Sequence, residues 1–308
     1  MSDLIPSEVF SSYKDGKLDK ETAIEYFKSF AEISENEHLR VRAVNLLGEI
    51  AMKSMDIFKF LEHLLISDSN DYIRSLVAGI IIRNYIDIGQ EAIRWTFLNE
   101  KKINCLIMLY KALEECDTEE SQLLKLEMER ELGKRYIEKY GILPREAIGL
   151  KFAELSTGYE IMNENEYSKD QKVHAVFKSK NQHVVDLIIS GFNLNNTFFL
   201  NLLSNLESLT LSTTNLRRIE CFSNLTKLKS LDLTANFLTE IPDLHCLRNL
   251  ESLKIEWNNI SYLIGIEKLE KIINAELSHN LFDLESLSKI ENQIISNHRT
   301  LNITNRFP

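Results

Sequence analysis

Residues 228–238 read LKSLDLTANFL and residues 250–260 read LESLKIEWNNI, with apolar side chains at the first, fourth, sixth and last positions and asparagine at the ninth. The same apolar pattern starts again every 22 residues, at Val184, Leu206, Leu228, Leu250 and Ile272. A fixed period of roughly 20–50 residues is typical of repeat architectures. We therefore expect the C-terminal half to be a stack of similar units.

Each unit combines two shorter periods. Alternation, as in Leu231-Asp232-Leu233, predicts a short strand whose two leucines point inward. Apolar residues then follow at every third position, which suits a 3₁₀ or short helical turn, as in Leu238, Ile241, Leu244, Leu247 and Leu250. Stacking such units predicts a curved parallel sheet that covers one buried core.

The repeated asparagines are Asn236, Asn258 and Asn280. We expect their amides to be buried and to hydrogen-bond loop backbone of their own and neighbouring units, because no strand ladder reaches those backbone groups. This makes the asparagine ladder structural rather than catalytic. Earlier units carry Phe192 and Thr214 at the same position.

The pattern resembles the leucine-rich-repeat superfamily, and in particular its 22-residue class of the form LxxLxLxxNxIxxIxxLxxL, typified by a regulatory subunit of protein phosphatase 1. The resemblance covers about residues 173–304. Terminal repeats need caps. A hairpin cap is predicted from residues 173–177 and the segment after His183, and a C-terminal cap from a helix at 284–294 and a strand at 301–303. The cap sequence typical of the phosphatase-regulator class is not evident.

The N-terminal half has helical spacing throughout, and one part of it repeats. Superposing Leu39-Arg40 on Ile73-Arg74 requires a shift of 34 residues. The apolar-Arg dipeptide that opens each helix pair resembles short HEAT repeats over about residues 19–116. A tetratricopeptide array has a similar period, but its signature positions are missing. We expect a HEAT-like α-helical solenoid at 1–141, a helical lead-in and linker at 142–172, and a leucine-rich-repeat α/β solenoid at 173–308.

Composition narrows the possible functions. The net charge of −10 disfavours nucleic acid as a partner. No apolar run reaches the length of a membrane span and no secretory signal is recognisable, so we expect a cytoplasmic protein that does not bind membranes. The four scattered cysteines are expected to be buried hydrophobes in a reducing compartment. Phosphate-loop, dinucleotide, zinc-protease and nucleophile-elbow motifs are missing, so no catalytic residue, cofactor or metal site is predicted.

The repeat register nevertheless indicates which residues face outward on the concave side. Equivalent positions of neighbouring parallel strands form rows about 4.8 Å apart. Large and charged residues gather at the C-terminal end of these rows, and exposed aromatics are typical of partner sites. The predicted partner-binding residues are Asp232, Phe237, Lys254, Glu256, Trp257, Glu276 and His279. In the charged row the alternating signs could instead simply neutralise one another.

Two hypotheses follow. The first is a non-catalytic scaffold or adaptor that binds a protein partner on the concave leucine-rich-repeat face. The second is a lyase-like or other enzyme that uses a groove between the two repeat domains. A stoichiometric protein recovered from native lysate would favour the first hypothesis, and a co-purified chromophore or small ligand would favour the second.

Overall fold

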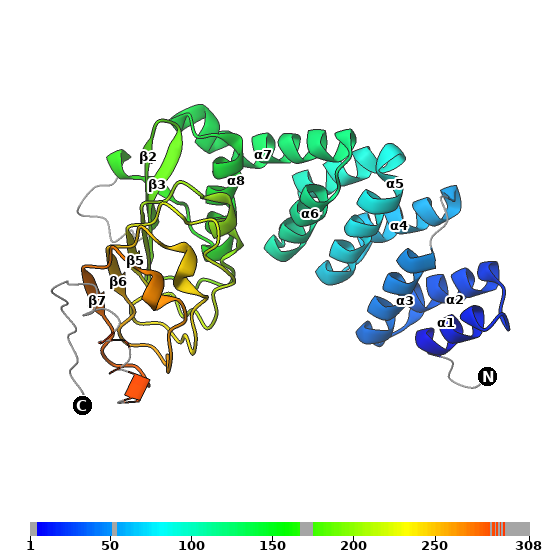
Figure 1. The fold of residues 1–308 in the computed structure, drawn as a ribbon. Helices are drawn as coiled ribbons and strands as arrows, with labels where there is room; N and C mark the ends of the chain where they lie inside the picture. Colours follow the sequence, from blue (N-terminus) through cyan, green and yellow to red (C-terminus); the bar gives the residue numbers. More distant parts are fainter. Residues whose placement is uncertain are drawn as a thin grey trace. The chain divides into compact units, whose positions relative to one another are not determined.

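The computed structural model describes residues 5–50, 54–166 and 175–283, together with 285, 286, 288, 290 and 292. The chain forms two compact units, residues 1–131 and 132–308. The first contains helices, and the second contains all the described strands (Figure 1). The predicted order, helices followed by a largely parallel sheet, is confirmed. The C-terminal cap expected at 284–303 and the start of the hairpin at 173–174 lie outside the described residues, apart from the five single positions.

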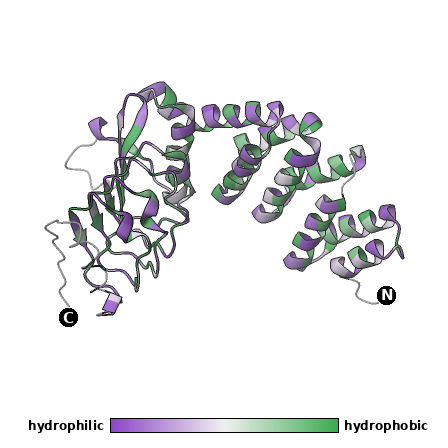
Figure 2. Ribbon diagram, viewed as in Figure 1, coloured by the Kyte–Doolittle hydropathy of each residue, from purple (hydrophilic) through white to green (hydrophobic). Residues whose placement is uncertain are grey.

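The first unit is built from consecutive helices. They are α1 (Pro6–Lys14), α2 (Lys20–Ile33), α3 (Glu37–Ile50), α4 (Met55–Ser67), α5 (Asp71–Asn99), α6 (Ile103–Glu115) and the start of α7 (Glu119–Tyr140). Helix α5 is interrupted at Tyr85, whose φ of −140° and ψ of 20° are not helical, so it consists of two helices in sequence. The helices carry hydrophobic and hydrophilic sides (Figure 2). The hydrophobic sides pack α2 on α3, α4 on α5 and α5 on α6.

The two Arg residues of the repeated dipeptide make equivalent contacts. Arg40 donates through Nε to the Ala31 carbonyl (2.7 Å) near the end of α2, and its guanidinium pairs with the Asp68 carboxylate after α4. Arg74 donates to the Asp68 carbonyl (2.8 Å) and to both Glu100 oxygens, at 2.8 and 3.0 Å. Each guanidinium therefore connects the end of the preceding helix to an acidic residue further along the chain. For Arg40 this residue is Asp68, after α4, and for Arg74 it is Glu100, after α5.

The second unit begins within α7 and continues through α8 (Pro144–Thr157). Its strands are β1 (Met162–Asn163), β2 (Ala175–Lys180), β3 (His183–Ser190), β4 (Ser208–Ser212), β5 (Ser230–Asp232), β6 (Ser252–Lys254) and β7 (Asn274–Glu276). Short 3₁₀ turns are η1 (Glu164–Glu166), η2 (Phe198–Leu202), η3 (Leu244–Cys246) and η4 (Ile266–Lys268). The last three connect successive repeats where the sequence spacing by threes predicts such turns.

The strands form one sheet in chain order, β1 to β7. Strands β2 and β3 are antiparallel, as the hairpin cap requires, and all other pairs are parallel. From β3 onward, paired residues lie 22 positions apart, as in Leu209, Leu231, Leu253 and Ala275. These side chains are fully buried, while Asp232 and Lys254 between the buried positions stay partly exposed.

The asparagines bridge consecutive repeats. Asn258 accepts the Leu238 amide (3.0 Å) of the preceding repeat and donates to the carbonyls of Leu233 (2.9 Å) and Ile255 (3.1 Å). Asn236 and Asn280 make the same kinds of contact one repeat earlier and one repeat later. Where asparagine is replaced, the Thr214 hydroxyl donates to Asn236 Oδ1 (2.9 Å). The ladder thus satisfies loop groups that the strands do not reach.

Helix α8 closes the first repeat. Gly149 lets the helix approach η2, because a Cβ there would lie 2.9 Å from Leu203 and 3.1 Å from Leu202. The buried Glu146 carboxylate accepts the Val184 amide (2.5 Å) and the Asn205 side-chain amide (2.6 Å). This polar contact fixes α8 over the start of the sheet.

Replacing Asn258 by Ala should cost about 1–3 kcal/mol of unfolding free energy, because the buried Leu238 amide loses its acceptor. The Leu233 and Ile255 carbonyls each lose one of two asparagine donors and keep the other, from Asn236 and Asn280. Asn259 is exposed, and its Ala variant should stay within about 0.5 kcal/mol of wild type. Urea unfolding of the two variants measures the difference. Equal midpoints and slopes would contradict the assigned register.

Replacing Arg74 by Ala should cost about 3 kcal/mol near neutral pH, because the Glu100 side chain is only 6% exposed and would lose its guanidinium partner. Burial raises the pKa of Glu100, but hydrogen bonds from Arg74 and from the Lys102 amide outweigh it and hold that pKa below its ordinary value. A depressed folded-state pKa contributes stability above the unfolded value of about 4.3 and loses it as the pH falls through the folded value.

The stability gap between wild type and Arg74→Ala should therefore narrow as the pH falls from about 5 to about 2. Urea unfolding followed over this range measures it. Lys17→Ala, which removes an exposed ion pair with Asp15, is the control and should change stability by less than about 0.5 kcal/mol. A gap for Arg74→Ala that stays constant with pH would show that the Glu100 carboxylate does not depend on this pair.

Candidate functional site

The candidate site lies on the outer face of the sheet, defined here as the face opposite the buried leucines. The charged row on this face consists of Asp232, Lys254 and Glu276, which pair across β5, β6 and β7. The Lys254 ammonium lies 3.0 Å from Glu276 Oε1, and the Asp232 carboxylate accepts the Thr234 amide (2.9 Å). Among the described residues, the ion pair of this row joins Lys254 to Glu276.

Carboxylates outnumber ammonium groups around Lys254. A hydrogen bond to Glu276 is the main cause that raises the pKa of Lys254, and the charges of Glu276, Asp232 and Glu256 add to it. The pKa of Glu276 is lowered, first by a hydrogen bond from Asn274 and then by Lys254. Glu256 in turn accepts a hydrogen bond from the Ser278 hydroxyl. This part of the outer face therefore carries a net negative charge.

One residue shortly after each strand from β3 to β7 has a left-handed backbone, either directly after the strand or three positions later. We name these positions the left-handed row. It contains Gly191, Thr213, Ala235, Trp257 and His279, with φ values of 80°, 51°, 57°, 57° and 57°. For residues with a Cβ this conformation costs roughly 1–2 kcal/mol, so glycine or asparagine is favoured there. A tryptophan in this conformation is held by the surrounding repeat, and such outliers are frequent at functional sites.

Trp257 and His279 form a stacked pair. Their ring centroids are 3.5 Å apart and the ring planes differ by 13°. Despite this contact Trp257 remains 57% exposed, and Phe237 nearby in the repeat register is 54% exposed. We call Phe237, Trp257 and His279 the aromatic patch. Strand pairing thus brings Asp232, Lys254 and Glu276 together, and Trp257 stacks on His279. Phe237 is assigned to the patch by its exposure and its place in the repeat alone.

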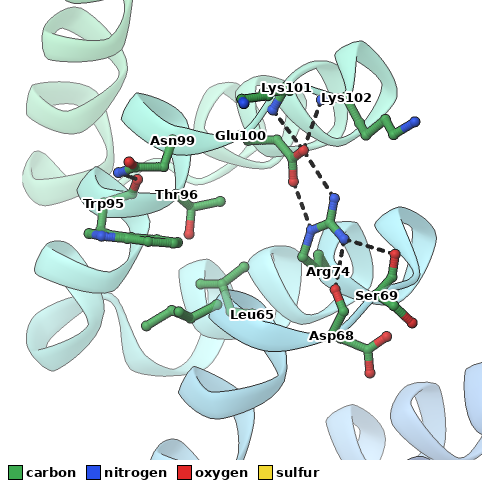
Figure 3. Close-up of a pocket in the computed structure, with 11 residues that line it drawn as sticks. Leu65, Asp68, Ser69, Arg74, Trp95, Thr96, Asn99, Glu100, Lys101 and Lys102 are labelled. Carbon is green, nitrogen blue, oxygen red and sulfur yellow. Dashed lines mark hydrogen bonds and ion pairs between the residues drawn. The ribbon is translucent and has the colours of Figure 1, made fainter.

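A pocket in the helical unit was not predicted from the sequence (Figure 3). It has a volume of about 340 Å³ and lies between the end of α4 and the second part of α5. Trp95, which is 45% exposed, and Leu65 line it opposite the Arg74–Glu100 ion pair. A signal was present in the sequence: Ile93 and Phe97 are buried four positions apart, so Trp95 between them must face the other way.

The charged Arg74 and Glu100 side chains at the pocket are already hydrogen-bonded to other groups of the protein. The guanidinium of Arg74 is already shared between Glu100 and the end of α4, and the Glu100 carboxylate also accepts the amides of Lys101 and Lys102. Within the described residues, no group of histidine, cysteine or acidic side chains is arranged to hold a metal ion. None of the described helices is both long and apolar enough to cross a bilayer.

Comparison with known proteins supports leucine-rich repeats in the second unit. Residues 204–260 match the family model described as leucine rich repeat. Among solved structures, an internalin from Listeria monocytogenes is similar, with 19% sequence identity and a TM-score of 0.28. The alignment covers 40% of this chain and 43% of the internalin chain, so this chain spans less than half of that structure. No curated protein matches the chain.

The left-handed backbone at Trp257 generates a stability prediction. In a strand, a glycine variant is usually less stable than the corresponding alanine variant by about 0.5–1 kcal/mol. At a position with positive φ this order of stability should reverse. Trp257→Gly should therefore be more stable than Trp257→Ala, by about 1 kcal/mol. Thermal unfolding of both variants tests this. At Thr210, inside β4, the alanine variant should be more stable than the glycine variant. If the alanine variant were also the more stable one at position 257, the left-handed backbone assigned there would be contradicted.

Proposed function

We propose that this chain is a non-catalytic adaptor that binds a protein partner on the outer face of its leucine-rich-repeat sheet, the concave side of the repeat stack. The observation that carries the proposal is Trp257, an exposed indole on a left-handed backbone that the repeat core does not need. Partner contacts are assigned to Asp232, Phe237, Lys254, Glu256, Trp257, Glu276 and His279.

The energetics of interfaces support this assignment. Binding energy concentrates in a few aromatic or arginine side chains that are surrounded by polar contacts of small individual effect. The aromatic patch supplies such anchors, and the charged row beside it supplies polar contacts. Leucine-rich-repeat regions act in protein interaction, which agrees with the match at residues 204–260. Neither the comparisons nor the described residues supply an observation that favours the enzyme hypothesis.

We also propose the class of the leucine-rich repeat, the kind of helical repeat in the first unit and the cellular location of the chain. Strand pairing at an offset of 22 residues supports the 22-residue class of the repeat, typified by the phosphatase regulator. The equivalent contacts of Arg40 and Arg74 support HEAT-like repeats in the first unit. We assign the chain to the cytoplasm, consistent with its four free cysteines, and propose no nucleic-acid or membrane partner.

Replacing Trp257 by Gly should weaken the partner by roughly thirtyfold or more, because an aromatic anchor commonly contributes about 2 kcal/mol or more. The partner is first isolated by pull-down from source-cell lysate with the full-length chain, and affinities are then measured by titration calorimetry. Thr210→Ala, on the same face and two strands away, is the matched control and should bind like wild type. Equal affinities for the two variants would move the site away from the outer face.

A further inference from the structure

The two faces of the Trp257 indole differ. One face is covered by His279, which belongs to the next repeat and stacks at 3.5 Å with nearly parallel planes. Since the left-handed row advances one repeat at a time, the opposite face of the indole is turned toward the preceding repeat. The equivalent residue there is Ala235, whose side chain is a single methyl group, followed by the exposed Thr213. The indole therefore keeps one free face beside a position with little side-chain volume.

The charges beside this face are unbalanced. Asp232 precedes Ala235 by three positions in the preceding repeat. The Glu256 carboxylate is instead held by the Ser278 hydroxyl of the following repeat, on the side of His279. Both carboxylates act on the Lys254 ammonium, but the ion pair of that ammonium is with Glu276. The Asp232 carboxylate accepts a hydrogen bond from the neutral Thr234 amide. The Asp232 carboxylate therefore has further acceptor capacity for a cation.

A guanidinium combines the two properties that this place requires. It is planar and stacks on an aromatic face, and its five donors match carboxylates in a fixed fork. A lysine ammonium is compact and more strongly hydrated, so it makes the charge contact without the stacking contact. A neutral aromatic ring would stack but would cover the Asp232 carboxylate without pairing it, which is unfavourable.

We propose that the partner places an arginine side chain on the free face of Trp257, with Asp232 as its carboxylate acceptor. The exposed Phe237 at the rim accepts the methylene stem of this arginine or an apolar neighbour of it. The inference rests on the proposed function, because it names the chemistry by which the same site recognises its partner. It implies that partner binding weakens with salt, since its central contact joins opposite charges.

The test uses the full-length chain and small probes, N-acetyl-arginine amide and its lysine and citrulline counterparts. The chain contains two tryptophans, Trp95 and Trp257, so the indole N–H region of an NMR spectrum is simple to assign with a Trp95→Phe variant. The arginine probe should shift the Trp257 signal saturably, with a dissociation constant on the order of 1–10 mM for a single side chain. The lysine probe should bind at least about fivefold more weakly, and the neutral citrulline probe should give no saturable shift.

Variants identify the acceptor. Asp232→Asn should weaken binding of the arginine probe by about threefold or more, and raising salt from about 0.05 M to about 0.5 M should also weaken it. Glu256→Gln should weaken binding less than Asp232→Asn, because the Glu256 carboxylate is held by the following repeat. Glu270→Gln, which removes an exposed carboxylate in the turn after η4, is the matched control and should bind like wild type. No shift at Trp257, equal shifts at Trp95 and Trp257, or equal binding of arginine and citrulline would each overturn the arginine inference.

Failure of this inference is distinguishable from failure of the proposed function. If Trp257→Gly releases the natural partner while the arginine probe leaves Trp257 unshifted, the outer face is the partner site but arginine is not the group recognised. If the arginine probe binds at Trp257 while the natural partner binds Trp257→Gly and wild type equally, the arginine site exists and the proposed function is wrong.

Discussion

The second unit depends on one interaction, the buried asparagine amide that bridges each repeat to the one before it. Asn258 holds the Leu238 amide of the preceding repeat and two carbonyls near its own strand and the preceding strand. In three repeats the left-handed residue directly precedes the asparagine, as Trp257 precedes Asn258. Gly191 and Thr213 are also left-handed although Phe192 and Thr214 follow them, so the conformation belongs to the turn of the repeat, and the asparagine anchors that turn where it is present. The outward direction of the aromatic patch follows from this constraint.

Features controlled by burial could be predicted from the sequence. The buried leucines recur with period two inside strands and period 22 between them, and both periods are visible in residues 228–260. The left-handed row could not be predicted, because only Gly191 has the residue type that normally signals a positive φ. The sequence also does not predict that Lys254 pairs with Glu276 rather than with Asp232. Both carboxylates are one strand away, and the additional Asn274 contact that positions Glu276 depends on three-dimensional geometry.

The first unit uses a different device for the same task of joining repeats. Asparagine amides are neutral, whereas Arg40 and Arg74 place a charge between helix ends where acidic residues and carbonyls converge. A buried ion pair adds little net stability compared with an apolar contact, but removing one partner is costly. Such a pair therefore fixes which helix ends meet more than it stabilises the fold. The repeated arginine is visible in the sequence. Its acceptors, Asp68 and Glu100, lie at different sequence separations from Arg40 and Arg74, so the repeat period does not predict them.

The size of the side chains differs between parts of the outer face, and this difference affects how a partner can bind. Along one column of paired strand residues the side chains are small, at Ser208, Ser230 and Ser252. The bulky side chains of the left-handed row come after the strands, in the last two repeats that this row contains. Small residues allow a partner backbone to approach the sheet, while an exposed indole with a covered and a free face fixes where one side chain must insert. A partner that approaches this sheet therefore gains most of its specific contact near the ends of β5 and β6, where Asp232, Glu256 and Trp257 lie within two neighbouring repeats.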